Sequence, residues 1–208
     1  LKNEGVEVCI EHGAGQQAGF TDDDYQNAGA GLTDRDSLFQ QADVILQVHT
    51  PGSNTRTGEQ DLERLRKGQT LIGMMDPLAN PDFARTLADR GVTGVALELI
   101  PRITRAQAMD VLSSMAMTAG YKSILLAANE ANRMFPMNMT AAGTLNPAKV
   151  FVMGAGVAGL QACAAAKRLG AVTKAYDVRE AAQEQIQSVG AEPVDLQLDT
   201  GDAEGSGG

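Results

Sequence analysis

Three glycines in the second half of the sequence have the spacing of a phosphate-binding turn. Gly154, Gly156 and Gly159 form a Gly-x-Gly-x-x-Gly pattern directly after the apolar run 149–153. In this pattern the first glycine makes a tight turn, the second lets the backbone approach a pyrophosphate, and the third lets a helix pack close to the preceding strand. The sequence therefore predicts that this turn binds the diphosphate of a dinucleotide.

The residues after the glycines complete the predicted dinucleotide site. An Ala-rich helical segment is expected at 160–169, ended by Gly170. The free N–H groups where this helix starts, at Val157 and Ala158, would contact the phosphates. The next strand ends in Asp177, 21 residues after the middle glycine, close to the spacing of about 20 expected for the acid that binds the adenosine ribose. An acid here favours NAD(H), because it would repel the 2′-phosphate of NADP(H), while Arg179 leaves the preference open. The alternative is a glycine-rich turn in a purely structural α/β unit.

A second group of polar residues follows an earlier predicted strand. The loop at 101–110 carries Arg102, Gln107 and Asp110 directly after the strand at 92–99. In an open α/β sheet, ligands bind at the carboxyl ends of the strands. The loop is therefore a second candidate ligand site, although Arg102 and Asp110 would also suit an ordinary ion pair at the surface.

Predicted strands and helices alternate along the chain, which is typical of a parallel α/β sheet. The strands are expected at 6–10, 42–49, 70–75, 92–99, 149–153 and 171–176. The predicted fold class is α/β, with two doubly wound, Rossmann-like parallel-sheet domains, the second truncated. We place the first domain, with a long connecting helix, at 1–135, and half of a Rossmann fold at 136–208. Both ends look cut, since Leu1–Gly5 resembles the last turn of a helix, and the acidic, Gly-rich residues after Asp195 resemble a solvated loop.

The composition argues against several kinds of partner and site. The net charge is −9 with a pI near 4.7 and no basic cluster, which argues against nucleic acid and anionic membranes. Cys9 and Cys163 lack a CxxC spacing and are expected to be buried, free thiols. His12 and His49 have no second ligand at a fixed spacing, so no metal site is predicted. No apolar run approaches the roughly 18 residues of a membrane span, so the chain itself is expected to be soluble.

Six segments together resemble the alanine dehydrogenase/pyridine-nucleotide transhydrogenase family. They are 11–25, 101–110, 112–114, 119–121, 140–143 and 154–160. The resemblance covers essentially the whole chain, and the loop at 101–110 is similar to that of the NAD(H)-binding domain of proton-translocating, Si-specific transhydrogenases. The family carries a further strand before this chain and a second half of the dinucleotide fold after it. The resemblance thus implies a fragment, which alone is expected to be inactive.

The resemblance also implies a reaction, partners and site residues. The transhydrogenase branch passes hydride between NADH and NADP⁺, the latter bound on a separate domain. By this resemblance Arg102, Gln107 and Asp110 surround the nicotinamide, and Ser113 lies near its carboxamide. The expected cofactor is NAD(H), with NADP(H) on a partner domain. The expected assembly is a homodimer with an NADP(H)-binding and a membrane domain, on the cytoplasmic or matrix face of a membrane, without nucleic acid.

Two other functions are alternatives. Alanine dehydrogenases carry a lysine and a catalytic histidine where this chain has 47–49 and 75–77, so no such pair stands where amino-acid oxidation would need it. Hydride transfer between two nicotinamides moves no proton at the reacting carbons, so the protein has only to align the rings. An alanine-dehydrogenase-like enzyme, with His49 as a remnant of the lysine site, is one alternative, and a non-catalytic NAD-binding module is the other.

Overall fold

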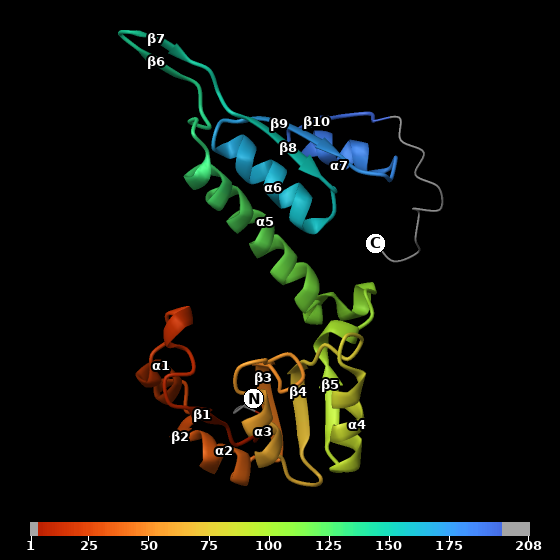
Figure 1. The fold of residues 1–208 in the computed structure, drawn as a ribbon. Helices are drawn as coiled ribbons and strands as arrows, with labels where there is room; N and C mark the ends of the chain where they lie inside the picture. Colours follow the sequence, from red (N-terminus) through yellow and green to blue (C-terminus); the bar gives the residue numbers. More distant parts are fainter. Residues whose placement is uncertain (1–3, 197–208) are drawn as a thin grey trace. The chain divides into compact units, whose positions relative to one another are not determined.

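The computed structural model describes residues 4–196, and the chain divides into two compact units, Leu1–Asp110 and Val111–Gly208 (Figure 1). Both units contain parallel strands joined by helices, so the predicted α/β, Rossmann-like fold class is confirmed. Helix α5 (Val111–Glu130) clusters with the second unit, whereas the sequence analysis places it in the first domain. Helix α5 belongs to the second unit because Gly120 and Ile124 pack against α6.

The first unit contains a two-stranded and a three-stranded parallel sheet within the described residues. Strand β1 pairs with β2, and β3, β4 and β5 pair in that order. The elements are β1 (Cys9–Glu11), η2 (Gln16–Ala18), α1 (Asp22–Asn27), β2 (Gly31–Thr33), α2 (Arg35–Gln41), β3 (Val44–His49), α3 (Gly58–Arg64), β4 (Thr70–Met74), α4 (Pro81–Asp89), β5 (Thr93–Ala96), η3 (Leu97–Leu99) and η4 (Thr104–Met109). All strands of the three-stranded sheet pair in parallel, so their carboxyl ends share one edge.

The core of the first unit lies between the three-stranded sheet and its helices. Its buried members are Phe39, Ile45, Leu65, Leu71, Met75, Phe83, Leu87 and Val92. Local signals start the helices: the Thr21 hydroxyl accepts the Asp24 N–H, and the Asp24 carboxylate accepts the Thr21 N–H, which is a capping box for α1. Pro81 occupies the first turn of α4, where its missing N–H would have had no partner within the helix. Asn80 is the N-cap residue of α4, but its side chain makes no capping hydrogen bond and its amide donates to the Gly52 carbonyl at 3.2 Å.

The second unit is built on a parallel sheet with the strand order β10, β9, β8. Its elements after α5 are β6 (Asn138–Thr140), β7 (Gly143–Leu145), β8 (Lys149–Met153), α6 (Val157–Arg168), β9 (Val172–Tyr176), α7 (Ala182–Ser188) and β10 (Glu192–Pro193). Val150 and Val152 of β8 pack with Ile124 of α5 and with the alanines of α6. Phe151 and Met153, on the opposite face of β8, are exposed. The helices described in this unit therefore cover one face of β8.

Two local features differ from the sequence analysis. Strands β6 and β7 form an antiparallel hairpin that projects from the second unit, in a stretch where the sequence predicts no strand (Figure 1). Its turn at Ala141 and Ala142 lacks the Asn-Gly or Asp-Gly pair that marks tight hairpins, so no sequence signal announces it. Cys163 is buried as expected, but Cys9 is exposed, on a strand that pairs only with β2 among the described residues.

Helix α5 is long and apolar enough to cross a membrane, judged by length and composition alone. The apolar residues of α5 do not form an unbroken run in the sequence, because they are interrupted by Ser113, Ser114, Thr118 and Gly120. One such helix is weak evidence for a membrane span, since helices of soluble proteins also meet this criterion. The predictions for residues 1–3 and for the tail after Leu196 lie outside the described residues.

Candidate functional site

The glycine turn connects β8 to α6 at the carboxyl ends of β8 and β9. Gly154 has a φ of 93°, in the left-handed region that favours glycine, and its N–H donates to the Tyr176 carbonyl at 2.8 Å. A Cβ on Gly159 would overlap the Gly154 carbonyl group, so only glycine lets α6 start this close to the turn. The geometry of these two glycines matches the turning and packing roles that the motif implies.

Gly156 is the N-cap of α6 and faces open space. A Cβ added to it would meet no atom within 4 Å, and no side chain caps the helix. The first N–H groups of α6, including those of Val157 and Ala158, have no acceptor within the helix and lie at the positive end of its dipole. These residues fit a diphosphate, since an approaching anion meets backbone donors and no obstructing side chain.

Asp177 directly follows β9 and lies beside this turn, with its side chain 8% exposed. Its carboxylate accepts the Ala155 N–H at 2.6 Å, the Arg179 N–H at 2.9 Å and the Arg179 Nε–H at 3.0 Å. The side-chain hydrogen bond from Arg179 is the main cause that lowers the pKa of Asp177 to about 2, and with the backbone bonds it outweighs the opposing effect of burial. The acid is therefore ionised at neutral pH and fixed against the turn.

The second group of predicted site residues follows β5. Arg102 is exposed, Gln107 is exposed on η4, and Asp110 ends η4, with its N–H donating to the Gln107 carbonyl at 3.2 Å. Ser113 lies in the first turn of α5 and, like Asp110, is half-buried. The structure brings Gln107 and Asp110 to one short turn of chain, while Asp177 and the glycine turn belong to the other compact unit. The roles of these residues around a nicotinamide stay predictions.

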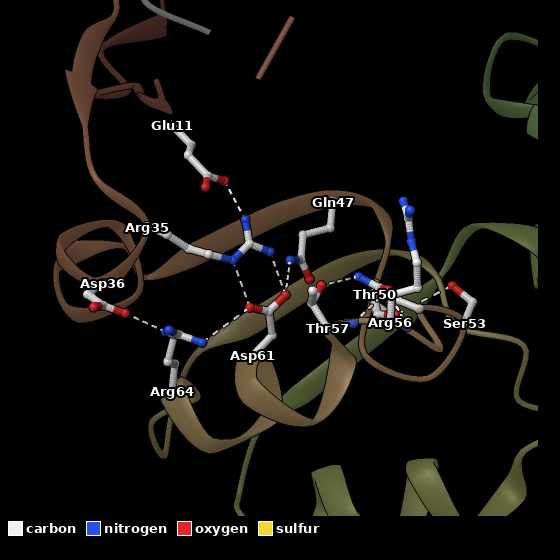
Figure 2. A network of polar contacts seen from close by, with 11 residues as sticks. Glu11, Arg35, Asp36, Gln47, Thr50, Ser53, Arg56, Thr57, Asp61 and Arg64 are labelled. Atoms are coloured by element: carbon white, nitrogen blue, oxygen red, sulfur yellow. Dashed lines mark hydrogen bonds and ion pairs between the residues drawn. The ribbon is translucent and has the colours of Figure 1, made fainter. Parts of the chain in front are cut away.

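The first unit also contains a buried ionic network that no sequence pattern indicates (Figure 2). Asp61 of α3 is 1% exposed and accepts the Nε–H of Arg35 at 2.8 Å and its Nη2–H at 2.5 Å. Gln47 of β3 donates to the same carboxylate at 3.0 Å, and Arg35 also pairs with Glu11 of β1. Burial acts to raise the pKa of Asp61, but the hydrogen bonds from Arg35 and Gln47 outweigh it and lower the pKa. The network therefore ties β3, α2 and α3 together through the ionised carboxylate of Asp61, and Arg35 extends it to β1 through Glu11.

Another carboxylate closes the turn after β4. Glu98, in η3, accepts the Met75 N–H at 2.7 Å and the Asp76 N–H at 2.5 Å. Pro77 follows and has no N–H to offer. Asp76 has a φ of 52°, and His49, at the end of β3, is exposed. These are the positions where alanine dehydrogenases, by the resemblance, carry their histidine and lysine.

Comparison with known proteins gives two family matches. The model described as "Alanine dehydrogenase/PNT, N-terminal domain" matches residues 1–119, and the corresponding C-terminal domain matches residues 123–203. The chain is 46% identical over 200 residues to the NAD(P) transhydrogenase subunit alpha of Cereibacter sphaeroides, covering 96% of this chain and 37% of that protein. It is 31% identical over 182 residues to the alanine dehydrogenase of Mycolicibacterium smegmatis, covering 86% of this chain and 47% of that protein.

A solved structure extends this similarity to the fold. The crystal structure of transhydrogenase from Sinorhizobium meliloti matches with a TM-score of 0.87 at 47% sequence identity, covering 94% of this chain and 55% of that chain. The chain thus spans between 37% and 55% of the lengths of these three proteins.

Proposed function

The chain belongs to the alanine dehydrogenase/pyridine-nucleotide transhydrogenase family, and from this premise we propose that it is the NAD(H)-binding part of a proton-translocating transhydrogenase. Its 46% identity to a transhydrogenase alpha subunit, against 31% to an alanine dehydrogenase, supports this branch of the family. The proposed reaction is hydride transfer between NADH and NADP⁺, with the second nucleotide bound on a separate domain.

The residues of the second unit would hold the cofactor. Bound NAD(H) supplies the hydride chemistry, and the protein supplies its binding and orientation. The diphosphate would bind the backbone at Gly156, Val157 and Ala158, and the open, uncapped start of α6 supports this assignment. Asp177 would accept the hydroxyls of the adenosine ribose, with Arg179 beside it. This open turn next to an ionised acid is the observation that carries the proposal.

The polar loop of the first unit would position the reacting ring. Direct hydride transfer needs the two nicotinamides close and aligned, and it needs no general base at the reacting carbons. Arg102 would hydrogen-bond the carboxamide or the ribose, Asp110 would accept from the carboxamide or orient Arg102, and Gln107 would reach toward the second nucleotide. Ser113 would lie near the carboxamide. The exposure of Arg102 and Gln107 leaves both side chains accessible to a ligand.

The proposed assembly is a homodimer that works with an NADP(H)-binding domain and a membrane domain, on the cytoplasmic or matrix face of the membrane. The exposed apolar side chains of the β6–β7 hairpin support a dimer, because a two-stranded hairpin in water is only marginally stable by itself and gains stability from packing. It exposes 81% of Met139, 59% of the adjacent Met137 and 49% of Leu145. A second copy of the chain would cover this apolar hairpin.

A reconstitution experiment tests the proposed reaction. The complete protein, mixed with NADH and an NADP⁺-loaded transhydrogenase NADP(H)-binding domain, should produce NADPH. Gln107→Ala and Arg102→Ala should each lower this rate by about tenfold or more, as expected when one positioning contact is lost. Arg105→Ala, an exposed residue of the same loop, is the matched control and should keep the rate. Wild-type rates in both site variants would remove the assignment of the loop, and binding of NADH without any transfer would indicate a non-catalytic module.

Alanine oxidation is the second candidate function. The 31% identity to an alanine dehydrogenase and the exposed imidazole of His49 at the end of β3 favour testing it. The complete protein would be assayed with alanine and NAD⁺, and His49→Ala would serve as the comparison. Alanine-dependent NADH formation that His49→Ala abolishes would replace the transhydrogenase proposal.

A further inference from the structure

The carboxylate of Asp177 has a hydrogen-bond donor at each of its acceptor positions. Its Oδ1 accepts the backbone N–H of Arg179 at 2.9 Å and the Nε–H of Arg179 at 3.0 Å. Its Oδ2 accepts the N–H of Ala155 at 2.6 Å and the Nη2–H of Arg179 at 3.3 Å. An ionised carboxylate offers about four lone-pair positions. A ribose hydroxyl that binds Asp177 must therefore replace one of these donors.

The four donors differ in how readily they can be exchanged. The two backbone N–H groups, of Ala155 and Arg179, are fixed by the turn and by the end of β9. The other two belong to the guanidinium of Arg179, whose side chain is 43% exposed and makes one further long contact, 3.4 Å, to the Ala155 carbonyl. The backbone alone positions Asp177, and the guanidinium is the donor that a ligand can displace.

We propose that the side chain of Arg179 occupies the acceptor positions of Asp177 that the adenosine ribose hydroxyls take, and that NAD(H) binding releases it. The released guanidinium is then a free cation next to the 2′-position of the ribose. Arg179 thus limits the discrimination against NADP(H) that Asp177 creates. This inference rests on the proposed binding of NAD(H) at the glycine turn.

The charges of the two side chains set the direction of this effect. The hydroxyls of NAD(H) are neutral donors, so they can replace the guanidinium on an ionised Asp177 without bringing two anions together. The 2′-phosphate of NADP(H) is an anion, and Asp177 repels it while the displaced Arg179 attracts it. Selectivity is therefore the difference between a repulsion and an attraction from neighbouring residues.

Dissociation constants for NADH and NADPH, measured by calorimetry on the complete protein, test this inference. Arg179→Ala should bind NADH as tightly as wild type or a few-fold more tightly, because the competing donor is gone. It should bind NADPH about tenfold more weakly, the usual effect of one lost charge-assisted contact, so the NADPH/NADH ratio of dissociation constants rises about tenfold. Lys174→Ala removes a cation that pairs with Glu192 on the same sheet and should leave the ratio unchanged.

The complementary change is Asp177→Asn. This variant should release the guanidinium of Arg179 even without a ligand, and the NADPH/NADH ratio of dissociation constants should fall about tenfold. Adding Arg179→Ala to it should cancel the gain in NADPH affinity. NMR titration of the protein without nucleotide gives an independent readout, since Arg179→Ala should raise the pKa of Asp177 above its value of about 2. Circular dichroism would establish that each variant is folded.

The outcomes separate the possibilities. The inference would be overturned if Arg179→Ala bound NADH several-fold more weakly and left the NADPH/NADH ratio of dissociation constants unchanged. Arg179 would then be a residue that positions Asp177. An unchanged pKa of Asp177 in that variant would also overturn it. If wild-type protein binds neither nucleotide, the proposed function fails as well. NADH binding to the wild type with no change of ratio in any variant leaves the proposed function intact and removes only the role of Arg179.

Discussion

The turns after β4 in the first unit and after β8 in the second show how similar strand ends can acquire different uses. In both, a carboxylate from the end of the neighbouring strand accepts backbone N–H groups of the turn. Glu98 accepts two of them, from Met75 and Asp76, at 2.7 and 2.5 Å. Asp177 accepts one, from Ala155, at 2.6 Å.

The donors that remain differ between the two turns. After β4 the two occupied donors, Met75 and Asp76, are followed by Pro77, which has no N–H. After β8 the occupied donor, Ala155, is followed by Gly156, the N-cap of α6, and no side chain caps this helix. A parallel sheet places both turns at the carboxyl ends of strands, and the second turn leads into the uncapped start of a helix, whose first N–H groups can bind a phosphate. The topology of the sheet therefore places a turn at the end of each strand. The backbone N–H groups that remain unoccupied in a turn determine whether it can bind an anion.

Gly159→Ala should have the largest effect. The added Cβ would overlap the Gly154 carbonyl, and neither backbone segment can move without displacing β8 or α6. We expect the free energy of unfolding of the second unit to fall by about 3 kcal/mol or more, because overpacking against backbone exceeds the usual range. Urea denaturation followed by circular dichroism measures this loss. A change smaller than about 1 kcal/mol would show that close helix packing is not what this glycine provides.

Asp61→Ala should have the next largest effect, in the first unit. Arg35 would lose a buried partner that is 1% exposed, and Gln47 would lose its acceptor. We expect a loss of about 2–3 kcal/mol, below the full value for a buried pair because Arg35 is itself 32% exposed.

Asp36→Ala is the matched control for Asp61→Ala. Asp36 pairs with Arg64 in the same network but is 68% exposed, so its loss should cost less than about 1 kcal/mol. Urea denaturation measures the free energy of unfolding of both variants. Equal losses would contradict the view that the carboxylate of Asp61 holds the first unit together.

Gly156→Ala separates binding from folding at the phosphate turn. No atom lies within 4 Å of the added Cβ, so the free energy of unfolding should change by less than about 1 kcal/mol. The methyl group would stand where the diphosphate approaches, so NADH affinity should fall about tenfold. Calorimetric titration of the complete protein with NADH checks this. Unchanged affinity would mean that the open space at Gly156 does not receive the phosphates.

The acid dependence of stability should show the smallest effect. The pKa of Asp177 is about 2 in the folded chain and near 3.8 when unperturbed, so its contribution is fully present above about pH 4 and is lost as the pH falls toward 2. Because the side chain of Arg179 is 43% exposed and solvent screens the pair, we expect Asp177 to contribute about 1 kcal/mol to the free energy of unfolding. Urea unfolding of wild type and Asp177→Asn between pH 6 and pH 2 should show a difference that disappears at the acid end. A difference that persists at pH 2 would contradict this assignment.

The site in the second unit could be predicted from the sequence, because its parts are local in the chain. Gly154 and Gly159 act on the adjoining turn and helix, and the position of Asp177 follows from the length of one helix and one strand. The network of the first unit has no such local pattern. Asp61 lies among charged residues of α3, which is typical of a solvated helix face, and only the packing of α2 against α3 brings Arg35 to it. Likewise, no spacing rule shows that Arg179 fills the acceptor positions of Asp177.

The contact between α5 and α6 has one further consequence. A Cβ on Gly120 would overlap the Ala158 carbonyl, so the backbone of α5 rests directly on the first turn of α6. Ser113 lies seven residues earlier on the same continuous helix, which corresponds to about 10 Å along its axis. α5 therefore serves as a spacer of fixed length between Ser113 and the start of α6. A slip by one helical turn at Gly120 would change that spacing by about 5 Å.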